Sequence, residues 1–185
     1  LSQNAGVSWI TLANNSCDCN NIMGYDQDES GGQAPRDMDI IISPINPDII
    51  HVAGVETWRS TNAGQSWNKT TVWSNPNGSN FIHADIDLLI YDGQRIIAGT
   101  DGGIYYSTNE ADSWTDITPG LGIRQFYRIG AAQTEIDRVS GGSQDNGTAV
   151  LRNGNWYDWL GADGMETFIA WDNDDIVYGT SQNGS

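Results

Sequence analysis

The chain has 185 residues, with 24 acidic side chains against 8 basic ones and a formal net charge of −16. This balance excludes nucleic-acid binding, which needs cationic groups to neutralise phosphates, and docking on an anionic membrane surface. Eight tryptophans and seven tyrosines argue against disorder, and 22 glycines favour a turn-rich all-β protein. No apolar run reaches the ~18 residues of a membrane span, so no membrane insertion is expected.

An eight-residue pattern, S-x-N-x-G-x-S-W, opens the chain at residues 2–9, and it returns at 60–67 and, with Ala111 in the glycine place, at 107–114. The asparagine of this pattern can accept backbone N–H groups in a tight turn, and the glycine can adopt a positive φ. The tryptophan can bury a large ring between neighbouring sheets. We therefore expect a structural role for Asn4, Gly6, Trp9, Asn62, Gly64, Trp67, Asn109 and Trp114.

Residues 14–35 show no hydrophobic periodicity and are predicted to form a surface loop insertion. Long loops often line a ligand-binding face, and a solvated insertion is the alternative. Cys17 and Cys19 lie in this segment, too close in sequence to bond to each other without strain, and we expect them to be structural or idle.

A β-rich run, a turn and a second run ending in glycine recur four times, at residues 38–54, 85–99, 126–142 and 166–179. Further strands follow in the inner copies, and four short strands every ~45 residues are typical of propeller blades. The prediction is an all-β protein, a β-propeller of four-stranded antiparallel blades. Its expected parts are the end of a blade at 1–12, blades at 36–72, 81–118 and 124–160, and the start of a further blade at 164–185.

Two arrangements of these blades remain open. Because the first residue is not an initiator Met and the last copy stops after its second strand, the preferred expectation is a fragment, about four blades of a larger propeller. In the alternative, the N-terminal strand completes the last blade and closes a small ring of four.

The eight-residue pattern resembles the Asp-box of BNR-repeat β-propellers, which sialidases, family 74 glycoside hydrolases and sortilin/VPS10 ectodomains share. Four stretches, at 99–109, 123–134, 141–148 and 161–168, also resemble secreted bacterial VPS10/BNR-like proteins. This resemblance implies a propeller fold and an extracellular or cell-surface location. It implies little about function, because the box is structural, and the chain departs from it by using Asn at all three Asp positions and by Ala111.

In a propeller, the first strand of each blade lines the central channel, and its beginning lies on the face where ligands bind. The corresponding positions supply the ligand-binding candidates Asp37, His83, Asp85, Arg124, Tyr127 and Asp163. Since alternate residues of a strand share one face, His83, Asp85 and Asp87 are expected to point together.

Carboxylates from different blades could act as general acid and base on a glycosidic bond. The best catalytic pair is Asp39 and Asp87, with Glu166 next. Alternatively, these acids accept backbone N–H groups inside the channel or lie in water. A sialidase is not favoured, because no arginine triad occupies matching blade positions and an anionic sugar suits a charge of −16 poorly.

The remaining site predictions concern metals and aromatic rings. A hard cation could bind at the His83-x-Asp85-x-Asp87 run or at the glycine-rich loops with Asp101, Asp145 and Asn146. No cofactor is expected, with Ca²⁺ as the one candidate ion. Tryptophans outside the repeated pattern are expected either to stack on sugar faces or to fill gaps between blades. Trp58 and Trp156 are kept as ligand-binding candidates.

Two function classes follow. The preferred one is a secreted or cell-surface propeller module that binds a protein or a glycan. The alternative is a family 74-like glycoside hydrolase that acts on a neutral polysaccharide through paired channel carboxylates. The first is preferred because no complete catalytic set is visible. The expected partners are a protein or neutral polysaccharide ligand and the remaining blades of the parent chain, with no nucleic acid.

Overall fold

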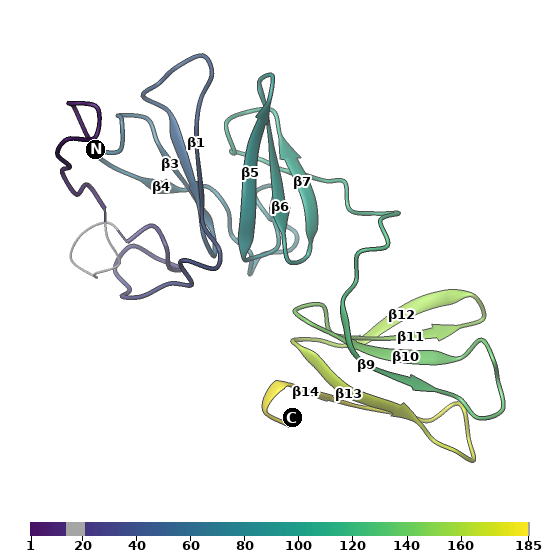
Figure 1. The fold of residues 1–185 in the computed structure, drawn as a ribbon. Helices are drawn as coiled ribbons and strands as arrows, with labels where there is room; N and C mark the ends of the chain where they lie inside the picture. Colours follow the sequence, from purple (N-terminus) through teal and green to yellow (C-terminus); the bar gives the residue numbers. More distant parts are fainter. Residues whose placement is uncertain (14–20, 185) are drawn as a thin grey trace. The chain divides into compact units, whose positions relative to one another are not determined.

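A computed structural model describes residues 1–13 and 21–184 of the chain (Figure 1). Cys17 and Cys19 lie outside the described residues, so the prediction made for them stays a prediction. The chain divides into two compact units, Leu1–Gly120 and Leu121–Ser185, and each is described by itself. In the described ranges, the regular structure is β-sheet apart from one 3₁₀ turn at Gln182–Gly184, and these ranges contain no helix that could cross a membrane.

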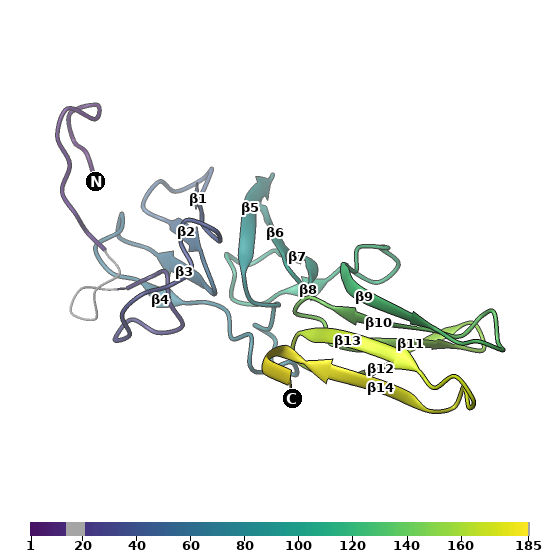
Figure 2. The ribbon, with the colours of Figure 1, turned by 60° about the horizontal axis from the view of Figure 1, so that its bottom comes forward.

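The first unit holds two sheets of four strands, each an antiparallel meander in chain order (Figure 2). The first sheet consists of β1 (Asp39–Ile42), β2 (Ile50–Ala53), β3 (Thr57–Ser60) and β4 (Asn68–Lys69). The second consists of β5 (Ile86–Asp92), β6 (Arg95–Thr100), β7 (Gly103–Ser107) and β8 (Thr115–Asp116). Both sheets have the predicted architecture of a propeller blade.

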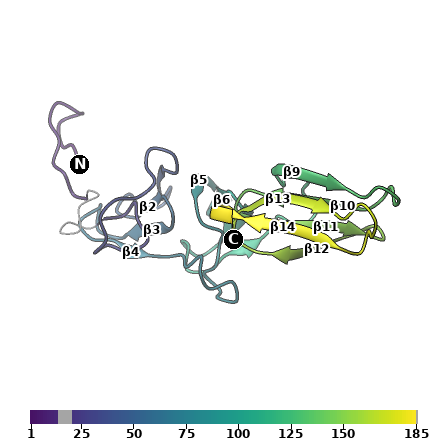
Figure 3. The same ribbon diagram turned by 90° about the horizontal axis from the view of Figure 1, so that it is seen from below.

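The second unit repeats this plan once and then half of it again (Figure 3). Its four-stranded sheet consists of β9 (Phe126–Ala131), β10 (Val139–Ser143), β11 (Thr148–Arg152) and β12 (Asn155–Leu160). Two more strands, β13 (Gly164–Ile169) and β14 (Val177–Ser181), form an antiparallel pair.

Within each unit, the first strands of consecutive sheets lie next to each other, β1 against β5 and β13 against β9. In the first unit, the Asp39 carboxylate accepts the Leu89 N–H at 2.8 Å. In the second, glycines allow the close approach, since a Cβ on Gly130 would lie 2.7 Å from the Phe168 Cα. This is the packing of neighbouring propeller blades, so the predicted fold class is confirmed. The total number of blades stays a prediction.

Two apolar clusters hold the first unit together. In the larger cluster, Ala53 of the first sheet packs with Ile86, Leu89 and Ile96 of the second sheet, so the two sheets share one apolar core. The smaller one packs Trp58 and Trp67 against Ile22. Ile22 comes from the predicted loop insertion, and the side chain of Asn21 beside it is fully buried. The described part of this loop is therefore anchored on the first sheet, and a wholly solvated insertion is wrong for residues 21–35.

The three copies of the repeated pattern fold into the same turn. At residues 60–67, Asn62 accepts the Ser66 N–H at 2.9 Å, and the Gly64 N–H donates to the Ser60 hydroxyl at 2.8 Å. The copies at 2–9 and 107–114 make the same two bonds. The predicted roles of the asparagines and glycines are thus confirmed, and Ala111 adopts the left-handed conformation (φ 69°) in the glycine place.

The tryptophans of the three copies differ in burial. Trp67 is 8% exposed and donates its ring N–H to the Gly64 carbonyl at 3.1 Å, and Trp114 packs against the larger core cluster. Trp9 is 73% exposed, which corrects the prediction that its ring is buried between sheets. The reason is that residues 1–12 form no strand, and Leu1 and Ile10 bond each other through two backbone hydrogen bonds instead of pairing with a sheet.

A partly buried polar network links the turn of the third copy to the first sheet. The Glu110 carboxylate accepts hydrogen bonds from the Tyr91 hydroxyl at 2.5 Å and the Ser43 hydroxyl at 3.2 Å, and it contacts the ring nitrogen Nε2 of His51 at 2.9 Å. These donors hold the pKa of Glu110 below its ordinary value although burial acts in the opposite direction. The network therefore fixes the second sheet against the first at the side of the turns.

We expect Asn62→Ala to lower the free energy of unfolding by about 1–2 kcal/mol, because it removes three side-chain hydrogen bonds from a turn that is packed against the core. Asn4→Ala is the matched control. It deletes the same bonds from an exposed copy and is expected to cost less than about 0.5 kcal/mol. Urea unfolding followed by tryptophan fluorescence measures both, and equal losses would contradict this ranking.

Candidate functional site

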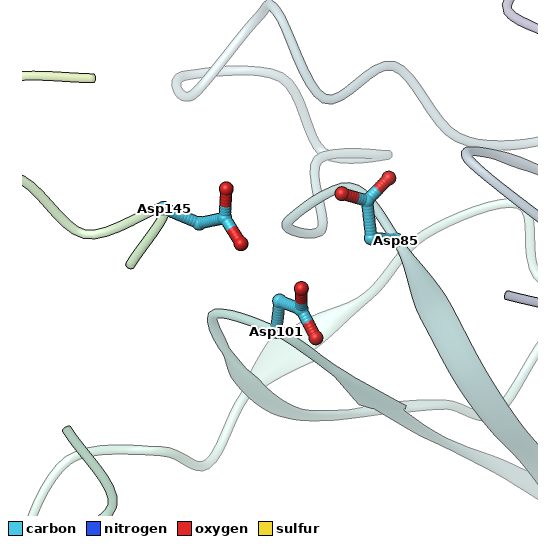
Figure 4. A group of neighbouring side chains, drawn as sticks. All are labelled: Asp85, Asp101 and Asp145. Atoms are coloured by element: carbon cyan, nitrogen blue, oxygen red, sulfur yellow. The ribbon is translucent and has the colours of Figure 1, made fainter. Parts of the chain in front are cut away.

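Three carboxylates gather at one end of the first unit. Asp37 lies two residues before β1, Asp85 directly precedes β5, and Asp101 follows β6; these three residues are called the acidic cluster. The Asp101 N–H donates to the Asp85 carbonyl at 3.2 Å, and carboxylate oxygens of the two residues lie within 4.8 Å of each other (Figure 4). Asp145, drawn in the same figure, belongs to the second unit and is not part of this cluster.

Arg36 holds the acidic cluster together. Its guanidinium group bonds the Asp37 carboxylate at 2.6 Å through Nη1 and the Asp101 carboxylate at 2.7 Å through Nη2. The Gln33 amide donates to the Asp85 carboxylate at 2.6 Å. The Asp37 side chain is fully buried, and its second oxygen, Oδ2, has no hydrogen-bond partner among the described residues.

The crowding of these acids changes their protonation. Burial raises the pKa of Asp37 to about 6, and the negative charge of Asp85 adds to this effect. Burial and the charge of Asp101 likewise raise the pKa of Asp85 above its ordinary value. The Asp101 carboxylate raises the pKa of Arg36, so the guanidinium stays charged. A bound proton or a further cationic group would therefore relieve repulsion in the cluster.

His83, Asp85 and Asp87 do not follow one another along a regular strand, although the charge of His83 acts on Asp85. The strand starts only at Ile86, and Asp85 before it has a φ of 62°. The pairing of β5 with β6 shifts register between Ile86 and Leu88, which places Asp87 in a bulge where its side chain is exposed. Alternation along a regular strand was the basis of the prediction, and it fails because this segment is not a regular strand.

The same irregularity recurs in the second unit at the start of each first strand. The pairing of β9 with β10 shifts register around Tyr127, and the pairing of β13 with β14 shifts around Glu166. Tyr127 is 38% exposed, and the exposed Glu166 carboxylate lies 3.5 Å from the Arg128 side chain. Bulges re-aim side chains and are common next to binding sites, so these positions remain candidates.

Asp39 takes the alternative role that the sequence left open. One of its carboxylate oxygens accepts the Ile40 N–H and the other the Leu89 N–H, each at 2.8 Å. Both oxygens are thus engaged by the backbone of two neighbouring sheets. Asp39 links the first strands, while Asp87, its predicted catalytic partner, points to the surface.

Of the other predicted binding residues, some bond to neighbouring side chains or backbone groups and one is exposed. Arg124 forms an ion pair with Asp158 at 2.6 Å, and the Asp163 carboxylate accepts the Asp145 N–H at 2.7 Å. Trp156 is 51% exposed and stacks on Phe126 with ring centroids 5.9 Å apart.

The prediction for Trp58 is wrong. Its side chain is only 3% exposed, packed in the smaller core cluster, and the Lys69 ammonium group lies 5.9 Å from the ring centroid. The ring therefore has no free face for a sugar and serves the core, as in the alternative that tryptophans fill gaps.

The structure contains a pocket that was not predicted from the sequence. This pocket of about 310 Å³ lies between the described part of the loop insertion and the first sheet, and it is lined by Gly24, Tyr25, Glu29, Ser30, Gly32, Gln33 and Val55. Because the loop lacks periodicity, no pattern showed that it folds back; the only available signal was the closely spaced tyrosine, acid and glycines.

Comparisons with known proteins bear on this chain only weakly. No protein-family model and no curated sequence matches it. An ancestral GH74 enzyme is 19% identical with a TM-score of 0.37, and the match covers 79% of this chain and 22% of that one. The GH74 xyloglucanase from Xanthomonas campestris is 14% identical with a TM-score of 0.38, and the match covers 70% of this chain and 24% of that one. YCF48 from Cyanidioschyzon merolae is 11% identical with a TM-score of 0.35, and the match covers 83% of this chain and 59% of that one. The chain spans about a quarter of the length of these GH74 enzymes.

The raised pKa of Asp37 predicts how stability depends on pH. The folded state binds a proton at Asp37 more tightly than the unfolded state, so this group favours folding below about pH 4, and its contribution is lost as the pH rises through about 6. Relative to the unchanged chain, Asp37→Asn should therefore become more stable from pH 4 to pH 7, by about 1 kcal/mol or more.

Thermal or urea unfolding across this pH range measures the difference. The control is Asp48→Asn, an exposed carboxylate in the turn between β1 and β2, which should show no such trend. A difference between Asp37→Asn and the unchanged chain that stays constant with pH would show that Asp37 is ionised normally.

Proposed function

We propose that the chain is a secreted or cell-surface β-propeller module that binds a protein or glycan ligand. The observation that carries this proposal is the bonding of Asp39. Because both of its oxygens accept backbone N–H groups, the best catalytic candidate of the sequence is occupied in joining two sheets. A carboxylate held in this way is poorly suited to take or give a proton in each reaction cycle.

The first unit offers features of a binding site. The acidic cluster lies at the start of β1 and β5, and Gln33 connects it to the pocket under the loop. This pocket combines a tyrosine ring with carboxylate, hydroxyl and amide groups. A preformed concavity with a few polar groups is typical of ligand-binding sites.

A glycoside hydrolase of the family 74 kind, acting on a neutral polysaccharide, is the second candidate. It is favoured by the pKa of Asp37, about 6, which is in the range of a general acid, and by the exposed Asp87. It is disfavoured by the full burial of the Asp37 side chain, which keeps a substrate oxygen away from this carboxyl group.

Binding and turnover can be separated with one panel of ligands. Binding of soluble xyloglucan and mixed-linkage β-glucan is tested by affinity electrophoresis, and binding of an array of synthetic peptides is tested by fluorescence. The release of reducing ends from the two polysaccharides is measured in parallel. We expect retention by a member of the panel with no release of reducing ends.

Hydrolysis that is lost in Asp87→Asn and kept in Asp48→Asn would overturn the preference for binding. Asp87 is the better test position than Asp39, because Asp39→Asn also weakens the link between the two sheets. Failure to bind any polysaccharide or peptide would contradict the proposed function as a whole.

A further inference from the structure

We infer that the pocket under the loop at residues 21–35 receives the lysine side chain of a protein partner. This inference rests on the proposed binding function and names the chemistry of its ligand. The pocket lies wholly within the first unit and has a volume of about 310 Å³, enough for one extended side chain.

The loop that covers the pocket is held in place from inside. The fully buried Asn21 amide donates to the carbonyls of Glu29 at 2.9 Å and Gly31 at 3.0 Å. Gly32 packs directly on the Met23 carbonyl, where a Cβ would collide, and its φ of 132° also requires glycine. The wall of the pocket is therefore formed before a ligand arrives, which lowers the entropic cost of binding.

Tyr25, a lining residue of the pocket, forms an aromatic pair with Trp73. The rings of Tyr25 and Trp73 lie 6.1 Å apart at 48°, and these residues are 45% and 43% exposed. Val55 adds an apolar wall. Such a surface can contact the methylene stem of a lysine, while the ring faces attract its ammonium group.

The charges around the pocket select a cation. Glu29 lines the pocket, and Asp85, Glu29 and Glu56 all act on the Tyr25 hydroxyl, whose pKa is raised by burial and by these charges. The lining residues include no basic side chain. The nearby cations are already engaged, Arg36 with Asp37 and Asp101, and Lys69 with Asp26.

Asp37 of the acidic cluster lies outside the pocket lining but is coupled to the pocket wall through Asp85. Its carboxylate is fully buried, and its Oδ2 has no hydrogen-bond partner among the described residues. Asp85 is the charged neighbour that acts most strongly on it, and Gln33 of the pocket wall is bonded to Asp85. A cation in the pocket would thus offset repulsion that extends through Asp85 to Asp37.

The test uses a capped peptide with one central lysine between glycines and, as the neutral control, the same peptide with the lysine acetylated. Binding is followed by the NMR shifts of the Gln33 side-chain amide and of the Gly24 and Gly32 amides. We expect saturable shifts with the lysine peptide alone, weakened by added salt.

Two variants remove the proposed contacts. Glu29→Gln and Tyr25→Ala are each expected to weaken binding about 5-fold or more, as the loss of one charge or cation–π contact implies. The matched control is Asp28→Asn, which makes the same change of charge on the same loop at an exposed position that does not line the pocket. It should leave the affinity nearly unchanged.

Three results would overturn the inference. The acetylated peptide could bind equally well, Asp28→Asn could weaken binding as much as Glu29→Gln, or a xyloglucan oligosaccharide could shift the pocket signals while the lysine peptide does not. In the last case the proposed function survives with a glycan as ligand. If neither these probes nor the wider panel bind, the proposed function fails as well.

Discussion

The acidic end of the first unit depends on the guanidinium group of Arg36, which lies between the carboxylates of Asp37 and Asp101. These two acids belong to different sheets, one before β1 and the other after β6, so a single cation joins the two sheets at their acidic end. In a chain with three times as many acidic as basic side chains, this position of an arginine decides which acids can lie close together. The repulsion that remains, together with burial, raises the pKa of Asp37 and Asp85.

The sequence predicted those parts of the fold that are decided locally. The bonds of Asn62 stay within one eight-residue turn, so the repeated pattern could be recognised and interpreted without any knowledge of packing. The alternation and turns of the hairpins are equally local, and their repetition predicted four-stranded sheets in chain order, which the structure shows.

The predictions that failed concern tertiary packing. Trp58 and Trp156 are indistinguishable in sequence, yet Trp58 is covered by Ile22 of the loop whereas Trp156 lies on an exposed strand. Asp87 was placed by strand alternation, and a bulge removed that regularity. For Asp39, the sequence offered both a catalytic role and a role as acceptor of backbone N–H groups, and only the position of Leu89 on the neighbouring sheet distinguishes them.

The central claim is that the buried Asp37 and the partly buried Asp85 and Asp101 crowd around one arginine at the end of the first unit. Titration of the Asp37 side-chain carboxyl by carbon NMR tests it most directly. The account predicts a pKa of about 6 for this group, well above the ordinary 3.8. A pKa at or below the ordinary value would show that Asp37 is neither desolvated nor close to other acids, and it would contradict the account.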